Sequence, residues 1–471
     1  MRIRALALGA TLLSMVVSLA GQERPLTPGV MPYVTVNAPV VALTHVRLVD
    51  GTGAPALPDR TVILSGPRIQ SVGPSASTAI PAGAQVIDLS NHTLLPGIVG
   101  LHEHTYFAGV RRVTEMSVSG PLLYLAYGVT TGMTAGSQLP YHELNLKRSV
   151  DAGDLPGPRF LIAGPYLNGP SRNPMSRNIT TPEEVRQVVA YWAGEGATWI
   201  KFLGTVTRDV LGAAIQEAHA RGLRVTGHLC SVTFTEAAAL GIDALQHGLI
   251  TNSDYVAGKR PDVCPPENMR AQADVDVSSP AVQASIRSIV ANKAAVVSTL
   301  GVYETFVPER ARLDPRALEM LEPETRREVE ATHAQLAQGA LVVPPRLLKK
   351  MMEWERAFVA AGGLLGAGSD PWGTGFLPGI GNLRNYELLV EAGFAPEEAV
   401  QILTLNGARI LGEADRVGSI APGKVADLVV IQGDPIRAPA DIYNVVTVFK
   451  DGVGYDSMRL REQARGKVGV N

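Results

Sequence analysis

The chain has 471 residues, of which 46% are hydrophobic and 18% are charged, an ordinary globular composition with ample material for a large buried core. The formal net charge of −2 at pH 7 argues against a binding surface for nucleic acid or anionic lipid, and against an acidic or disordered tail. This length permits one large barrel-type domain or about two to three smaller domains.

Residues 1–20 have the features of a secretory signal peptide. Two arginines precede an apolar stretch at residues 6–17, and residues 18–20 match a small-x-small cleavage site. We therefore expect an exported protein, periplasmic or secreted, with 40 basic and 44 acidic residues left after cleavage and no remaining contact with the membrane. A membrane anchor is the alternative, although the apolar run is short for the roughly 20 residues that a span needs.

Both ends of the chain have the pattern of short strands separated by turns. Residues 40–95 alternate apolar and polar positions and break at Gly or Asp-Gly, and residues 418–452 repeat this pattern. We expect residues 21–95 and 416–471 to form one small β-sandwich domain together, in which the beginning and the end of the chain meet.

Between these ends, residues 96–415 alternate strand-like and helical segments. The eight strand-like runs are at residues 97–104, 128–136, 159–164, 198–203, 224–229, 243–248, 295–302 and 364–370. The stretch at 207–222 illustrates the helices, because it begins with Thr207 and ends before Gly222. Eight strand–helix units over about 250 or more residues predict an α/β fold with a (β/α)8 TIM barrel.

Two segments interrupt this alternation. Residues 250–280 follow the sixth strand and are rich in Pro, Asp and Ser, and residues 304–350 follow the seventh strand and have the pattern of charged helices. Both should emerge at the C-terminal ends of the strands, where barrels build their active sites. We interpret each as a lid or pocket element, with a simple surface insertion as the alternative.

Two histidines, His102 and His104, lie one residue apart in the first strand-like run. Residues i and i+2 of a strand point to the same face, so both imidazoles should aim into the barrel. Taken alone, such a pair is more often two core histidines than a metal site. However, His228, His247 and Asp370 end the fifth, sixth and eighth strand-like runs. Imidazole and carboxylate together suit zinc and related divalent ions, so this convergence predicts a metal site.

Lys201 lies in the middle of the fourth strand-like run, among Trp, Ile, Phe and Leu. Burying an ammonium group is costly unless it is paired, and a dry site lowers the pKa of lysine and makes the amine nucleophilic. Such an amine can take up carbon dioxide and become a carbamate, whose two oxygens can bridge two metal ions. The alternative is a lysine paired with a barrel carboxylate, and the histidines and aspartate nearby favour the carbamate.

Together these motifs resemble those of the amidohydrolase superfamily, most closely the imidazolonepropionase-like and prolidase-like metal-dependent hydrolases with a binuclear centre. The resemblance covers nearly all of the chain that follows residue 20. It is carried by "LLPGIVGLHEH", "IKF", "GHL", "QHG" and "GSD" on the first, fourth, fifth, sixth and eighth strands, and by the stretch at residues 391–431.

The resemblance implies a centre of two divalent metal ions, with zinc expected and manganese, cobalt or iron left open. The implied ligands are His102, His104, Lys201, His228, His247 and Asp370. In this family the paired histidines and the aspartate hold one ion, the other two histidines hold the second, and the carbamylated lysine bridges them. One position departs from the pattern: the aspartate usually found two residues before the first histidine is Gly100 here.

The implied reaction is hydrolysis of a carbon–nitrogen bond, with dipeptides or N-acyl amino acids as expected substrates. A hydroxide that bridges the ions would attack the carbonyl carbon, and Asp370 would take its proton and pass it to the leaving amine. One alternative is a lactonase or phosphotriesterase-like esterase on the same metal centre. An alternative of another class is an inactive barrel that acts as a binding protein. The sequence leaves open whether the chain forms a homo-oligomer.

Substrate contacts must come from the loops. Arg172, after the third strand, could hold a substrate carboxylate, Tyr303 follows the seventh strand, and His142 follows the second and could line the pocket. The alternatives are a solvated arginine, a core tyrosine and a surface histidine. The third-strand histidine motif that we associate with the prolidase-like dipeptidases is absent, which weakens the case for Xaa-Pro specificity.

The chain has two cysteines, Cys230 and Cys264. Cys230 lies two residues after His228, and Cys264 lies in the insertion at residues 250–280. In an exported protein they could form a disulfide that holds the lid in place. Two free thiols are the equal alternative.

Overall fold

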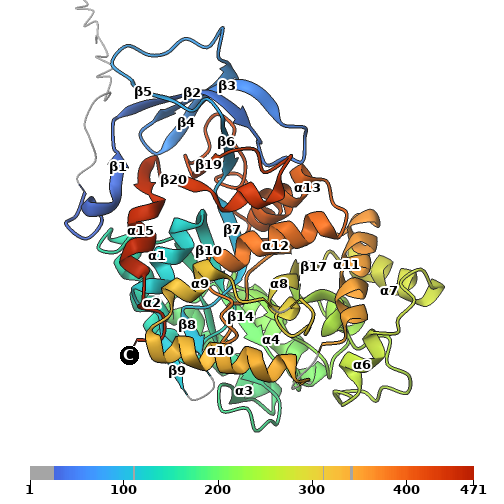
Figure 1. The fold of residues 1–471 in the computed structure, drawn as a ribbon. Helices are drawn as coiled ribbons and strands as arrows, with labels where there is room; N and C mark the ends of the chain where they lie inside the picture. Colours follow the sequence, from blue (N-terminus) through green and yellow to red (C-terminus); the bar gives the residue numbers. More distant parts are fainter. Residues whose placement is uncertain (1–25, 110–111, 311, 340–342, 471) are drawn as a thin grey trace, which may run out of the picture.

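The computed structural model describes residues 26–109, 112–310, 312–339 and 343–470. The expected signal peptide, at residues 1–20, lies outside this part of the chain. None of the described helices is long and apolar enough to cross a membrane. A cap of strands from both chain ends, blue and red in Figure 1, lies at one end of a larger body of alternating strands and helices.

The cap is one nine-stranded sheet made from both ends of the chain. Its strands are β1 (Val34–Val36), β2 (Val40–Leu48), β3 (Leu57–Ser65), β4 (Arg68–Pro74), β5 (Gln85–Asp88), β6 (His92–Pro96), β19 (Leu428–Gln432), β20 (Val445–Lys450) and β21 (Val453–Asp456). The strand order is β1–β21–β20–β19–β6–β2–β3–β4, and β5 pairs with β2 (Figure 1).

The two chain ends meet at an antiparallel pair, β6 against β19, in which Leu94 lies opposite Val430. Alternating apolar side chains of these strands, such as Leu43, Val62 and Phe449, pack into a core of their own. The two ends therefore share one sheet, and the sandwich of two packed layers stays a prediction.

The middle of the chain forms parallel strands at each of the eight expected places. These strands are β7 (Ile98–Glu103), β10 (Val129–Thr134), β11 (Arg159–Leu161), β12 (Ala163–Asn168), β14 (Trp199–Phe202), β15 (Arg224–Gly227), β16 (Ala244–Gln246), β17 (Ala295–Ser298) and β18 (Leu365–Ala367). Both β11 and β12 occupy the place of the third expected strand. They lie in two sheets, β11–β10–β7 and β12–β14–β15–β16–β17–β18, with β13 (Arg177–Asn178) beside β12. The parallel α/β architecture is therefore confirmed.

Backbone hydrogen bonds connect these two sheets where the strand ladders are interrupted. The N–H of Asp370, after β18, donates to the carbonyl of His102 on β7 at 2.7 Å. On the other side, the N–H of Tyr166 on β12 donates to the carbonyl of Ser137 at 3.2 Å. The first and last strands of the series are thus held side by side at the end where the candidate ligands lie.

Helices follow most of these strands and surround them (Figure 1). They are α1 (Ser119–Ala126), α2 (Pro140–Asp151), α3 (Pro182–Glu195), α4 (Arg208–Ala220), α5 (Phe234–Ala239), α7 (Pro280–Ala291), α11 (Pro345–Ala360), α12 (Ile380–Glu391), α13 (Pro396–Gln401), α14 (Gly407–Leu411) and α15 (Ser457–Ala464). α4 confirms the expected helix: Thr207 is its N-cap, and Gly222 beyond its end has a left-handed φ of 74°.

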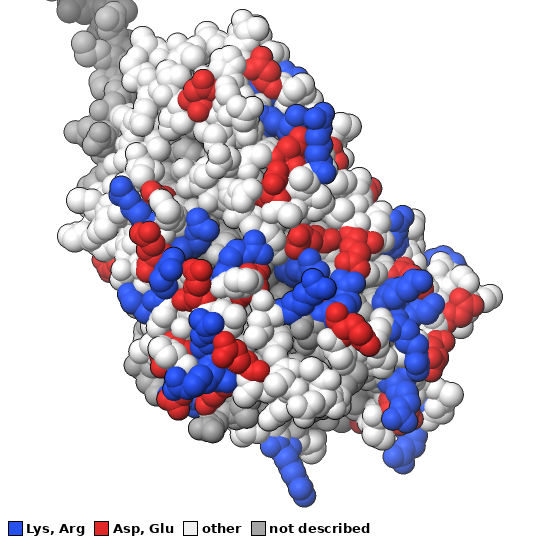
Figure 2. Space-filling model, viewed as in Figure 1, with Lys and Arg blue, Asp and Glu red and all other residues white. Residues whose placement is uncertain are grey.

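The two insertions differ in structure. Residues 250–280 contain the short helix α6 (Asn268–Gln272), and a disulfide between Cys230 and Cys264 ties this segment to the loop after β15. The disulfide alternative is therefore confirmed. The insertion after β17 is helical, with α8 (Leu300–Glu304), α9 (Pro315–Met320) and α10 (Pro323–Ala337). On the face shown in Figure 2, basic and acidic side chains intermingle, in keeping with the small net charge.

Candidate metal centre

The six residues expected to bind metal line one cavity of about 270 Å³. They are His102, His104, Lys201, His228, His247 and Asp370. They lie on or directly after β7, β14, β15, β16 and β18, all toward the C-terminal ends of those strands. Because parallel strands present these ends at the same edge, residues separated by up to 268 positions meet here.

The carboxylate of Asp370 is at the middle of the cluster. Its Oδ1 lies 3.2 Å from Nε2 of His104 and 3.5 Å from Nε2 of His102, and its Oδ2 lies 3.7 Å from Nδ1 of His247. One ligand atom each of His102, His104 and Asp370 fall within 4.8 Å of one another. The ring of His247 is 4.6 Å from that of His102 and 4.6 Å from that of His228. These distances are short enough for several of the side chains to bind the same metal ion.

Two polar residues that we did not single out from the sequence orient the histidines. Nδ1 of His102 lies 2.7 Å from Oε1 of Gln246, whose amide nitrogen donates to Thr226 at 2.7 Å. Because the Gln246 oxygen can only accept, Nδ1 of His102 is the donor in this series of hydrogen bonds. Nε2 of His102 therefore carries a lone pair, which is directed toward Asp370. Nδ1 of His247 likewise lies 2.8 Å from the hydroxyl of Thr299. Gln246 stands inside the "QHG" motif, so the motif itself contained this signal.

The backbone at two of the candidate ligands is unusual. His247 has φ = 69° and Asp370 has φ = 51°, both in the left-handed region that non-glycine residues rarely adopt. Such a conformation costs on the order of 1–3 kcal/mol and is concentrated at functional sites. The rest of the fold therefore holds both side chains in the direction of the cavity against a local conformational preference.

Lys201 is buried, and its Nζ has no hydrogen-bond partner among the described residues. Burial lowers the pKa of its amine to about 7, and the negative charge of Asp370 partly offsets this shift. No carboxylate in the described part of the chain forms the ion pair with Lys201 that the alternative interpretation required. Burying an amine without a hydrogen-bond partner costs free energy. The environment of Lys201 is therefore compatible with a covalently modified amine, such as the carbamate, whose additional polar atoms could bind a ligand.

The electrostatics of the cluster favour neutral imidazoles. Burial, followed by the charge of Lys201, lowers the pKa of His102 well below its usual value and that of His228 to about 4. The pKa of His247 is also well below the usual range, because of burial and the charges of its neighbours. Neutral imidazole is the form that binds a metal ion, so the donor set fits divalent ions.

The glycine that departs from the family pattern, Gly100, has a structural explanation. A Cβ at Gly100 would lie 2.1 Å from Oε1 of Glu103, so the carboxylate of Glu103 occupies the space that a side chain would need. Glu103 accepts hydrogen bonds from the side chain of Asn382 at 2.7 Å and from the backbone N–H of Ser369 at 3.3 Å. It thereby holds the segment that carries Asp370. Burial raises its pKa to about 7.

The three residues expected to contact substrate have different positions. Tyr303 lines the cavity, with its ring perpendicular to that of His247 at 5.4 Å. Arg172 is exposed and is not part of the cavity wall. His142 lies on α2, also outside the wall, with its Nε2 3.6 Å from Oε2 of Glu115. Roles in substrate binding for these residues stay predictions.

Further wall residues were not singled out from the sequence. The hydroxyls of Tyr106 and Tyr166 lie 2.6 Å apart, and the hydroxyl of Tyr166 is 3.3 Å from Nδ1 of His104. Tyr106 continues the alternation of His102 and His104, so strand periodicity could have identified it. The remaining wall residues are Asn173, Met175, Leu203, Val302, Phe306 and Trp372.

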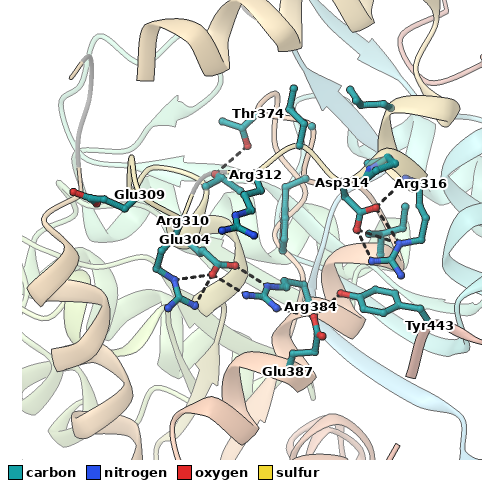
Figure 3. A pocket seen from close by; sticks show the side chains of 18 residues that line it. Glu304, Glu309, Arg310, Arg312, Asp314, Arg316, Thr374, Arg384, Glu387 and Tyr443 are labelled. Carbon is teal, nitrogen blue, oxygen red and sulfur yellow. Dashed lines mark hydrogen bonds and ion pairs between the residues drawn. The ribbon is translucent and has the colours of Figure 1, made fainter. Parts of the chain in front are cut away.

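A second cavity of about 730 Å³ lies beyond the segment 302–306 (Figure 3). Four arginines line it, Arg310, Arg312, Arg316 and Arg384. Glu304 accepts hydrogen bonds from Arg310 at 2.8 Å and from Arg384 at 2.7 Å.

At the other side of this cavity, Asp314 pairs with Arg316, whose guanidinium lies 3.4 Å from the centre of the Tyr443 ring. Among the described residues only the exposed Arg312 lacks an ion pair within this arginine set. The second cavity therefore has polar walls whose charges largely satisfy one another.

Comparisons with known proteins agree with this geometry. A family model described as "Amidohydrolase family" matches residues 365–454. An uncharacterized protein of Mycobacterium tuberculosis is 32% identical over 242 residues, which cover 45% of this chain and 57% of that protein. An imidazolonepropionase of Clostridium tetani is 32% identical over 115 residues, 22% of this chain and 26% of that protein. The chain thus spans little more than half the length of the mycobacterial relative.

Solved structures resemble the fold over most of the chain. A putative prolidase from Bifidobacterium longum has a TM-score of 0.64 at 24% identity, covering 90% of this chain and 98% of its own. A Xaa-Pro dipeptidase with bound methionine gives 0.66 at 20% identity, covering 88% and 100%. A bottromycin amidohydrolase gives 0.70 at 22% identity, covering 92% and 91%. The C-terminal segment therefore matches the amidohydrolase family, and the fold of most of the chain is similar to that of these solved structures.

Proposed function

We propose that the protein is a metal-dependent hydrolase that cleaves a carbon–nitrogen bond of amide type. The observation that carries the proposal is the buried amine of Lys201, which lies in one cavity with four histidines and Asp370 and has no hydrogen-bond partner in the part of the chain that the structure describes. An unpartnered buried amine is costly, so a residue of this kind in a cluster of metal-ligating side chains points to function. The names of the neighbours in fold, which include prolidases and amidohydrolases, support an amide substrate.

His102, His104 and Asp370 would hold one of two divalent ions, proposed to be zinc, and His228 and His247 the other. Lys201 would bridge them after its amine adds carbon dioxide to form a carbamate. When bound, the ions supply positive charge that activates water and polarises the substrate carbonyl. In the reaction one C–N bond breaks and one C–O bond forms. Asp370 takes a proton from the attacking water and delivers it to the leaving nitrogen.

We also propose that the strands β7 to β18 correspond to the eight positions of a (β/α)8 barrel. The bonds from Asp370 to His102 and from Tyr166 to Ser137, which bridge the interrupted ladders, support this. Export after removal of residues 1–20 is proposed from the sequence alone. The disulfide between Cys230 and Cys264 is compatible with an oxidising compartment.

The first test is the metal content per chain of the wild type and of Lys201→Ala, together with turnover of a substrate panel. The panel contains Xaa-Pro and Xaa-Arg dipeptides, N-acyl amino acids, neutral N-acyl amides, lactones and a phosphotriester. We expect two metal ions per wild-type chain, fewer in the variant, and amide turnover that falls with them. Turnover confined to lactones or the phosphotriester would favour the esterase alternative. One metal ion or none, with no hydrolysis, would contradict the proposal and favour a binding protein.

A further inference from the structure

The part of the cavity wall that is not made of the candidate metal ligands is largely apolar and aromatic. Tyr166 comes from β12, and the other side chains come from the segments that follow β12, β14, β17 and β18: Met175, Leu203, Val302, Tyr303, Phe306 and Trp372. Trp372 is 36% exposed and belongs to the few large apolar side chains at the surface, which places it at the rim. Apolar walls of this kind bind ligands by removing apolar surface from water.

Charged groups lie on only one side of this cavity. Among the described residues of the wall, Lys201 and Asp370 carry the only formal charges besides the imidazoles, and both belong to the candidate metal cluster. The other polar side-chain groups are the Asn173 amide, the indole N–H of Trp372 and the hydroxyls of Tyr106, Tyr166 and Tyr303, all neutral groups that can donate one hydrogen bond or more.

The arginines near the cavity are directed elsewhere. Arg172, the candidate for a carboxylate clamp, is exposed and is not part of the wall. Arg310 and Arg384 lie just beyond segment 302–306, but Glu304 pairs with both of them (Figure 3). Glu391 forms a further ion pair with Arg310, and Glu387 forms one with Arg384. The described residues of the apolar part therefore offer no cationic partner to a free substrate carboxylate, which would lose its hydration there.

We infer that this site selects amides whose parts beyond the scissile bond are small, uncharged and apolar, and that it discriminates against a free carboxylate there. The inference rests on the proposed function and narrows it, because dipeptides and N-acyl amino acids both carry such a carboxylate. The volume of about 270 Å³ lies just below the range of roughly 300–1,000 Å³ typical of small-molecule sites. Small substrates with one ring or one short alkyl chain on each side of the amide fit this space.

The test uses zinc-loaded wild-type protein and substrates that differ in one group. N-hexanoyl-4-aminobenzamide and N-hexanoyl-4-aminobenzoate have nearly the same size, and only the second carries a carboxylate. N-hexanoylaniline and its ω-carboxylated analogue test the acyl side in the same way. We expect kcat/KM to be at least ten-fold higher for the neutral member of each pair, with the difference mainly in KM.

Substitutions of Phe306 test whether the apolar wall causes the preference for neutral substrates. Phe306→Arg introduces a guanidinium into the apolar wall, which should reduce the preference for the neutral substrates at least three-fold by improving turnover of the carboxylates. Phe306→Gln is the matched control, since it removes the ring without adding charge, and it should lower all four rates without changing their ratio. Retained metal content and an unchanged far-UV spectrum would show that both variants are folded.

The outcomes separate the inference from the proposed function. Equal or faster turnover of the carboxylates by the wild type would overturn the inference and leave the amidohydrolase intact. If no amide is hydrolysed, the proposed function fails. The inference is then decided by calorimetric binding of the same four compounds to zinc-loaded protein, where tighter binding of the carboxylates would overturn it.

Discussion

The two cavities on either side of segment 302–306 differ in the way their polar groups are satisfied. The larger cavity, of about 730 Å³, is lined with arginines and carboxylates that pair with one another. The smaller one, of about 270 Å³, holds an amine for which the described residues provide no hydrogen-bond partner, and imidazoles whose pKa values are lowered by burial. Cavity size alone would have pointed to the first.

This difference teaches that a cluster of buried side chains able to bind metal, one of them without a hydrogen-bond partner among the described residues, identifies a site better than volume or formal charge does. A guanidinium that already donates to two carboxylates has little left for a ligand, as Arg384 shows with Glu304 and Glu387. A buried amine without a hydrogen-bond partner destabilises the fold unless something else binds to it. The paired cavity therefore serves stability, and the unpaired cavity is the candidate for chemistry.

The largest expected effect comes from one substitution in each cavity. Asp370→Asn removes the proton acceptor and a metal ligand, and we expect kcat to fall by about 10³-fold or more. Arg384→Met, in the other cavity, should lower kcat by less than about three-fold because Arg384 does not line the metal site. Initial rates on the best amide, at saturating zinc, give the comparison. Similar losses in both variants would remove the functional distinction between the cavities.

The second prediction concerns the disulfide beside the metal site. Removing it with Cys230→Ser and Cys264→Ser frees a loop of 34 residues, and we expect the free energy of unfolding to fall by about 2–4 kcal/mol. Because Cys230 follows His228 by two residues, metal affinity should weaken as well. Urea denaturation and zinc titration measure the two effects. If wild-type protein treated with reductant shows the same losses, their cause is the missing disulfide. An unchanged zinc affinity would show that the loop after β15 keeps its position without the disulfide.

The third prediction tests the paired cavity. Glu304→Gln leaves Arg310 and Arg384 without their shared carboxylate, and we expect a loss of about 1–3 kcal/mol in unfolding free energy. Zinc content should stay at the wild-type value. Thermal unfolding and metal analysis of the same preparation provide the measurement. A variant of normal stability that fails to bind zinc would mean that Glu304 serves the metal site and not the packing.

The smallest effect is expected at Glu355 on α11, a buried carboxyl group without an ion pair among the described residues, whose pKa burial raises from 4.5 to about 8. The unfolded chain releases this proton near its ordinary pKa and the folded chain retains it. Stability should therefore fall as pH rises between about 4.5 and 8. Glu355→Gln should stabilise the protein by about 1–2 kcal/mol at pH 8 and by little at pH 4.5. Denaturation at both pH values decides this, and equal effects would contradict it.

The sequence by itself determined the parallel strands and the candidate ligand set. Strand-like runs marked the eight expected places of the central series, although the short strands β8 (Tyr106–Ala108), β9 (Val113–Glu115) and β13 were not expected. The two-residue period of a strand directed His102 and His104 to one face. Lys201 was identifiable because an amine within an apolar strand is costly wherever that strand lies. These signals are local, so they do not depend on which segments meet later.

Tertiary structure alone decided the partners. Gln246 meets His102 across 144 positions of the chain, and Glu103 reaches Asn382 across 279. Strand register sets such contacts, and register depends on the whole sheet. The disulfide was one of two equal alternatives until two loops were brought together, and Arg172 faces solvent because the course of its loop directs it there. Local periodicity specifies the direction in which a side chain points, whereas the residue that it contacts is specified only by the packed fold.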